Sequence, residues 1–159
     1  MKQDLKDHLE KNNVSYEVHE HPAVFTVEDS KKLKNEIPGL HCKCLFLKGN
    51  NQKFYLVAMP AEKRLEMKSL RKKLDVKKLH FSSSGELKER LNLTPGSVSI
   101  FGMIHAKPGE VVFIIDKEVW DAGVVGFHPN INTATLEISH ENLERFLNSL
   151  DSDKKIMEL

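Results

Sequence analysis

The stretch from residue 42 to residue 59 constrains the fold of this chain more than any other. Two apolar runs are joined there by a polar segment that contains a glycine and two asparagines, a pattern that predicts a β-hairpin. Alternation along the first strand puts Cys42 and Cys44 on one face, and Lys43 and Leu45 on the other. Both faces are otherwise apolar, so we expect the hairpin to be covered on both sides. Lys43 then either extends its stem to water or needs a carboxylate or an anionic ligand as its partner.

Helical and strand patterns follow one another along the rest of the chain, with turn residues between them. Ser83 and Glu86 form a capping box at the start of one helix, and Ser139 caps the last helix before the chain frays at residues 151–155. Strands outnumber what a simple βαβ repeat would give, so the predicted class is α+β with a mixed, mostly antiparallel sheet. The predicted helices are 5–12, 26–36, 62–78, 83–91 and 139–150, and the strands beside the hairpin are 15–19, 79–81, 98–104, 111–115, 124–127 and 133–138.

Length and composition are those of one ordinary globular domain, residues 1–159, with 40% hydrophobic and 30% charged residues. A net charge of +1 neither favours nor excludes nucleic acid. The two cysteines lie at i and i+2 of one strand, where a disulfide is unfavourable, so we expect reduced thiols and a cytoplasmic protein. No apolar run reaches membrane-spanning length and no signal peptide is visible, so we expect no membrane association.

Positive charge is concentrated in residues 62–78, which contain eight cations and three acids. Such a segment can hold a phosphate backbone, although a run of charges is more often only the solvated face of a helix. The candidate phosphate-binding residues are Lys63, Arg64, Lys68, Arg71 and Lys72.

The sequence lacks the residue patterns of metal, cofactor or nucleophilic chemistry. His19 and His21 could share a face, but no Cys-x-x-Cys pair accompanies them, so we expect no metal ion. A Gly-x-Ser-x-Gly elbow, a phosphate loop and a dinucleotide fingerprint are all missing. We therefore expect neither a cofactor nor a nucleophile supplied by the protein.

Two short stretches have polar chemistry to offer. Residues 94–99, here called the glycine loop, place Gly96 before small hydroxyl residues and could present main-chain N–H groups to an anion or a developing oxyanion. Residues 126–130 place His128 and Asn130 at the end of a strand beside a proline. The alternative for each stretch is a plain surface turn.

Taken together, five segments resemble the YbaK-type aminoacyl-tRNA deacylases, and most closely their free-standing ProX branch, which is similar to the editing insertion of bacterial prolyl-tRNA synthetases. The resemblance spans roughly residues 14–148. Each motif alone is weak, but their common order makes the set fairly specific. The segments are residues 16–26, 43–48, 93–99, 127–130 and 132–135.

The resemblance implies a curved mixed sheet with helices outside and a pocket for a small side chain. It implies hydrolysis of the ester that links a wrong amino acid, alanine, to the 3′-terminal adenosine of proline tRNA, with the water activated by the ribose hydroxyl and with no metal. The implied partners are tRNA, held by the basic segment, and prolyl-tRNA synthetase. Lys43 would engage the tRNA 3′ end, and Gly96, Ser97, Val98 and Ser99 would cradle the carbonyl. The implied substrate-binding residues are Phe25, Thr26, Leu45, Ile100, Phe127, His128 and Asn130.

One departure from the family pattern concerns Ile100, because the family's loop commonly reads Gly-x-x-x-Pro and ends in proline. Isoleucine leaves the loop less rigid or reshapes the pocket. Two alternatives to alanine editing therefore stay open. The chain could be a tRNA-binding or synthetase-associated module with weak catalysis, or a deacylase for cysteinyl or another small aminoacyl group.

Overall fold

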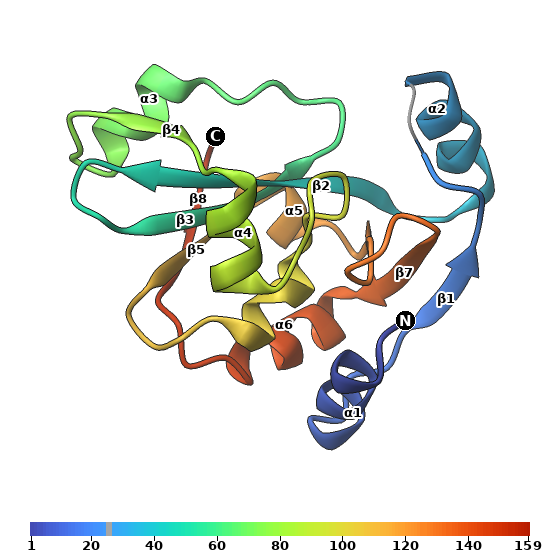
Figure 1. Cartoon of the computed structure of the whole chain (residues 1–159). Coiled ribbons are helices and arrows are strands. Elements are labelled where there is room, and N and C mark those ends of the chain that lie inside the picture. The colour runs from blue at the N-terminus through green and yellow to red at the C-terminus, as the bar shows by residue number, and fades with distance from the viewer. Residues whose placement is uncertain (25–26) are drawn as a thin grey trace.

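The computed structural model describes residues 1–24 and 27–159, so Phe25 and Thr26, two predicted pocket residues, lie outside the described part. Figure 1 shows a sheet with helices on both of its sides, which confirms the predicted α+β class. The helices are α1 (Gln3–Lys11), α2 (Val27–Glu36), α3 (Met67–Lys73), α4 (Ser84–Leu91), the 3₁₀ helix η1 (Ile100–His105), α5 (Lys117–Asp121) and α6 (His140–Asn148). The strands are β1 (Glu17–Glu20), β2 (Leu40–Gly49), β3 (Phe54–Pro60), β4 (Leu79–Phe81), β5 (Val111–Asp116), β6 (Val124–Phe127), β7 (Ala134–Ser139) and β8 (Lys154–Met157).

Strand β2 is the centre of the sheet. The strands are ordered β1-β7-β6-β2-β3-β5-β8, and β4 also pairs with β2. Four of the seven pairings are antiparallel, and one of these is the predicted hairpin of β2 with β3. On the other edge of β2, β6 pairs only with Leu40 and His41, and β4 pairs only with residues 47–49. The edge of β2 between these two pairings has no partner among the described strands.

The two faces of the sheet carry two separate apolar cores. The larger core packs the sheet against α1, α4, η1 and α6, and Phe146 is fully buried in it. The smaller core lies beneath α3, where Leu70 anchors the helix. Figure 1 shows α3 on the opposite side of the sheet from α1, α4 and α6. The predicted alternation along the hairpin is confirmed, because Cys44 belongs to the larger core and Leu45 packs against the smaller one.

Helix caps read from the sequence are present in the structure. The Ser83 hydroxyl accepts the Glu86 N–H at 3.1 Å, and the Glu86 carboxylate accepts the Ser83 N–H at 3.0 Å, so the capping box at α4 is complete. The Ser139 hydroxyl accepts the Asn142 N–H at the start of α6. Local hydrogen-bonding side chains therefore fixed these helix starts where the sequence predicted them.

Three predictions from the sequence are wrong. Residues 98–104 do not form a strand, because residues 100–103 are all buried as the first turn of η1, and a Cβ at Gly102 would lie 2.5 Å from Leu93. The C-terminal segment does not fray but pairs as β8 with β5, whose edge would otherwise be unpaired. The basic segment is helical only in α3, which is shorter than the predicted 62–78.

Candidate functional site

A cavity of about 830 Å³ lies beside the unpaired edge of β2. Its walls come from α2, β2, the segment after β3, the glycine loop and the hairpin of β6 with β7. The tertiary fold thus joins segments that are far apart in the sequence. Of the predicted site residues in the described part, those that line the cavity are Lys43, Gly96, Val98, Phe127 and His128.

Lys43 is half-buried in the wall of this cavity, and burial lowers the pKa of its ammonium group. No described residue forms a hydrogen bond or an ion pair with the Lys43 side chain. A partly desolvated ammonium without a partner is unfavourable, so the site favours an anionic ligand at this position.

Cations outnumber acids around the cavity. Lys31 and Lys34 of α2 line it together with Lys43, and among the described lining residues only Glu62 is acidic. Glu62 Oε1 lies 2.8 Å from Lys34 Nζ, so this carboxylate is already paired. The remaining positive potential favours a phosphate or another anion in the cavity.

The glycine loop is a turn that presents main-chain donors. Gly96 has φ +88°, which an L side chain rarely adopts, and the Ser97 N–H donates to the Thr94 carbonyl at 3.1 Å. The turn therefore uses the Ser97 N–H. The N–H groups of Val98 and Ser99 form no hydrogen bond to any residue that the structure describes. Val98 lines the cavity whereas Ser99 is fully buried, so the Val98 N–H is the donor of this loop that remains available to an anionic oxygen.

The other predicted site residues that the structure describes do not line the cavity. Ile100 is fully buried in the larger core, and Leu45 packs against the smaller core. The buried Ser99 hydroxyl donates to the His128 carbonyl and accepts the Phe101 N–H at 3.2 Å, so it ties the glycine loop to the β6–β7 hairpin. Asn130 is buried in that hairpin with φ +63°, and its Oδ1 has no partner within the described part of the chain. The residues concerned are Leu45, Ser97, Ser99, Ile100 and Asn130.

Two histidines are held in fixed orientations at the β7 side of the cavity. His128 Nδ1 lies 2.9 Å from the Ala134 carbonyl, so Nδ1–H is the donor and Nε2 keeps its lone pair. Burial, and then the neighbouring His21 and His41, lower the pKa of His128, which favours the neutral ring. His21 Nδ1 lies 2.8 Å from the Pro22 carbonyl and its Nε2 lies 2.9 Å from the Thr135 hydroxyl. The site therefore offers a neutral imidazole whose Nε2 can accept a hydrogen bond from a ligand.

Several cavity residues were not predicted as site residues. Cys42 and Cys44 line the cavity together with Lys43, although they lie on the other face of β2. The unpaired strand edge explains this, since a ligand beside such an edge touches side chains of both faces. Burial raises the pKa of the Cys42 thiol to about 12 and that of Cys44 well above its ordinary value, so neither is a thiolate at neutral pH. Thr135 also lines the cavity, and only its place within the 132–135 motif could have drawn attention to it.

The predicted phosphate-binding residues lie outside the cavity. Lys63 Nζ lies 2.9 Å from the buried Asp116 and 2.9 Å from Glu118, in a second hollow beside β5 and α5. Arg71 donates to a main-chain carbonyl at 3.4 Å. Arg64, Lys68 and Lys72 are exposed and form no hydrogen bond or ion pair to a described residue. Lys63 is thus the member of this set whose charge is already neutralised.

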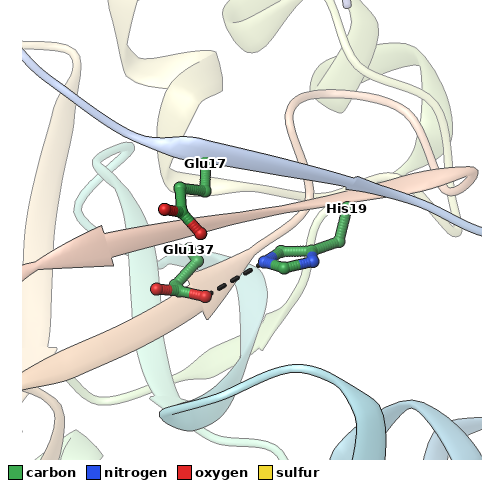
Figure 2. Close-up of side chains that lie close together, drawn as sticks. All are labelled: Glu17, His19 and Glu137. Atoms are coloured by element: carbon green, nitrogen blue, oxygen red, sulfur yellow. Dashed lines mark hydrogen bonds and ion pairs between the residues drawn. The ribbon is translucent and has the colours of Figure 1, made fainter.

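One group of side chains in residues 1–24 and 27–159 has ligand atoms close enough together to hold a metal ion, namely Glu17, His19 and Glu137. Figure 2 shows Glu17 and His19 on one strand, facing Glu137 on the neighbouring strand. His19 Nε2 lies 3.0 Å from Glu137 Oε1, so the contact is accounted for as a cross-strand pair. His21, the other histidine considered from the sequence, contacts Thr135 instead.

These features define a class of protein. It is an α+β domain that can hold an anionic ligand at an open strand edge, through one lysine and main-chain N–H groups, and whose cysteines at the site are protonated. The chain belongs to the aminoacyl-tRNA editing domain family, whose model matches residues 21–146. This confirms the resemblance read from the sequence motifs.

Individual relatives agree with that assignment. The chain is 33% identical over 152 residues to the prolyl-tRNA editing protein ProX of Acetoanaerobium sticklandii, covering 95% of this chain and 93% of that protein. It is 30% identical over 158 residues to the prolyl-tRNA synthetase associated domain-containing protein 1 of Bos taurus, covering 96% of this chain and 92% of that protein.

Solved structures share the fold at low sequence identity. One, described as a proposed trans-editing enzyme for prolyl tRNA synthetase, superposes with a TM-score of 0.73 at 17% identity, over 97% of this chain and 96% of that one. Another, the hypothetical protein APE2540, gives a TM-score of 0.74 at 18% identity, over 95% of this chain and 98% of that one. Across the described residues, no helix has the length and apolar character that a membrane span requires.

Proposed function

We propose that this protein is a trans-editing hydrolase that removes alanine from mischarged proline tRNA, by hydrolysing the ester at the 3′-terminal adenosine. The observation that carries the proposal is the half-buried Lys43 ammonium, which has no partner among the described residues and lines the same cavity as the glycine loop. An editing site needs a cation for the tRNA 3′ end and donors for the ester carbonyl, and this cavity offers both. Membership of the editing-domain family supports the same reaction.

In the proposed reaction, Lys43 binds a phosphate at the 3′ end and so positions the ester. The free N–H group of Val98 donates a hydrogen bond to the carbonyl oxygen, on which negative charge develops when water attacks the carbonyl carbon. The new bond joins the water oxygen to that carbon, the bond to the ribose oxygen breaks, and the ribose oxygen takes the proton. The neighbouring ribose hydroxyl orients the water, and the neutral His128 offers Nε2 to a donor group of the substrate.

The preference for alanine over proline follows from size. A closed pocket can exclude a larger ring sterically, whereas a synthetase site built for proline cannot exclude a smaller side chain. Phe127 is a buried wall of the cavity on its β6 side. The names of the relatives support proline tRNA as the substrate, and prolyl-tRNA synthetase as a partner that delivers it.

The test compares hydrolysis of alanyl-tRNA carrying the proline anticodon by the wild type, Lys43→Ala and Lys43→Arg. A hydrogen bond to a charged group contributes about 1.5–3 kcal/mol, so Lys43→Ala should lower kcat/KM by about 10- to 150-fold. Lys43→Arg keeps the charge and should retain part of the activity. Lys11→Ala is the matched control, because this exposed lysine lies on α1, across the molecule from α2 in Figure 1.

Three outcomes separate the proposal from its alternatives. Equal rates for wild type and Lys43→Ala, or no rate above the uncatalysed one, would exclude it. Tight tRNA binding without hydrolysis would favour a tRNA-binding module, especially if Ile100→Pro restored hydrolysis. Faster hydrolysis of cysteinyl or seryl esters than of alanyl esters on the same tRNA would assign a different amino acid.

A further inference from the structure

Phe81 is an exposed aromatic side chain that neither core uses. It is 59% exposed at the end of β4, and it is the one aromatic residue among the exposed large hydrophobics of the described chain. β4 pairs only with the far end of β2, in a register that places Phe81 opposite Leu47. Residues opposite one another in a sheet project from the same face, so Phe81 shares the face of Leu47.

That face is also the face of Lys43. Lys43 and Leu47 are four residues apart on β2 and therefore point the same way. The core contacts agree, because Leu47 and Met59, the register partner of Lys43, both belong to the smaller core. Four residues of strand separate Lys43 from Leu47 by about 13 Å, and Phe81 lies beside Leu47 on the neighbouring strand.

Unpaired cations lie on the helix that packs on this face. α3 packs on the same face through Leu70, and Figure 1 shows it beside β4. Its exposed lysines, Lys68 and Lys72, have no partner among the described residues. An aromatic ring beside free cations is the combination that binds single-stranded nucleic acid, since bases stack on the ring and phosphates pair with the cations.

We propose that Phe81 stacks on an unpaired base of the tRNA 3′ end, a few nucleotides before the terminal adenosine. This inference rests on the proposed function, which places the terminal nucleotide at Lys43. Stacked nucleotides advance about 3.4 Å each, so a distance of about 13 Å corresponds to about four nucleotides or, in a more extended strand, fewer. Phe81 therefore meets the single-stranded end before the base-paired acceptor stem begins, and α3 faces the phosphates that follow.

The direct test measures binding of an uncharged RNA microhelix with a single-stranded 3′ end by fluorescence anisotropy. Loss of one base–aromatic stack should weaken the Kd about tenfold in Phe81→Ala. Phe81→Tyr keeps the ring and should bind within about twofold of the wild type, whereas Phe81→Leu keeps only apolar bulk and should resemble Phe81→Ala. Ile156→Ala is the control, because Ile156 is 46% exposed on β8, several strands away in the sheet order.

A second measurement separates stacking from general damage to the site. With alanyl-microhelix, Phe81→Ala should raise KM about tenfold and leave kcat unchanged. With alanyl ester on a cytidine–adenosine dinucleotide, which is too short to reach Phe81, the variant and the wild type should have equal kcat/KM.

Several results would overturn the inference. These are a wild-type Kd for Phe81→Ala, a wild-type Kd for Phe81→Leu, or an equal loss on the dinucleotide ester. If Phe81→Ala left RNA binding unchanged but weakened the binding of a partner protein, this surface would be assigned to that protein instead. Failure here is distinguishable from failure of the proposed function, because the binding assay uses uncharged RNA and the Lys43→Ala assay does not involve Phe81.

Discussion

Replacement of Gly96 by alanine tests whether the left-handed turn of the glycine loop, rather than space around it, is what the site requires. Gly96 has φ +88°, and a Cβ built on it meets no atom within 4 Å. A Gly96→Ala side chain would therefore not collide with anything described, and the substitution acts only through the backbone. The turn must either remain strained or relax, and relaxation would move the Val98 donor.

The size of the effect follows from the backbone alone. Holding an L residue in the left-handed region costs about 1–2 kcal/mol. For a domain of this length, each kcal/mol lowers Tm by about 2–4 °C, so Gly96→Ala should lose about 2–8 °C. Gly109 is a matched control, because it has φ +81° with no atom within 4 Å of a built Cβ, and it does not line the cavity.

The two variants should therefore lose similar stability in urea or thermal unfolding but differ in deacylation. Gly109→Ala should keep the wild-type kcat/KM, while Gly96→Ala should lose at least about tenfold, since displaced main-chain donors no longer stabilise the oxyanion. Gly96→Asn should recover part of both properties, because asparagine tolerates the left-handed region. Unchanged stability in both alanine variants would refute the conformational reasoning, and equal activities would refute the role of the loop.

Three further predictions concern other parts of the chain. Because burial lowers the pKa of His128 from its ordinary value, enzymatic deacylation corrected for the uncatalysed rate should fall on acidification with a midpoint below pH 6.5. His128→Gln should remove that fall. The hydrogen bond from Lys48 and the capping box lower the pKa of Glu86 to about 2 from 4.5. The stability that Glu86 supplies is therefore present above pH 4.5 and is lost as pH falls towards 2. Urea unfolding of Glu86→Gln should lack this pH dependence. Ser99 is extended with φ −150° and ψ 154°, a conformation that a following proline tolerates, so Ile100→Pro should fold. It should lose about 1–3 kcal/mol of unfolding free energy because the buried isoleucine side chain is missing. Deacylation should stay within a few-fold of the wild type.

The sequence alone determined the elements whose signals are local. The hairpin of β2 with β3 follows from two apolar runs around a polar turn, and the capping box at Ser83 follows from hydrogen bonds within one helical turn. The turn at Gly96 was equally legible, because proline and glycine fix its dihedral angles. Each of these signals lies within a few residues, so no knowledge of the rest of the chain was needed.

Only the tertiary structure decided which residues form the cavity. Lys43 was recognisable as a lysine in an apolar strand, but the presence of Cys42 and Cys44 in the same wall depends on β6 and β4 leaving part of β2 unpaired. The pairing of β8 with β5 and the coiling of η1 depend likewise on edges and surfaces supplied by distant segments. The physical reason is that local hydrogen bonds and dihedral preferences are written in neighbouring residues, whereas a cavity is the space left over when segments distant in sequence have packed.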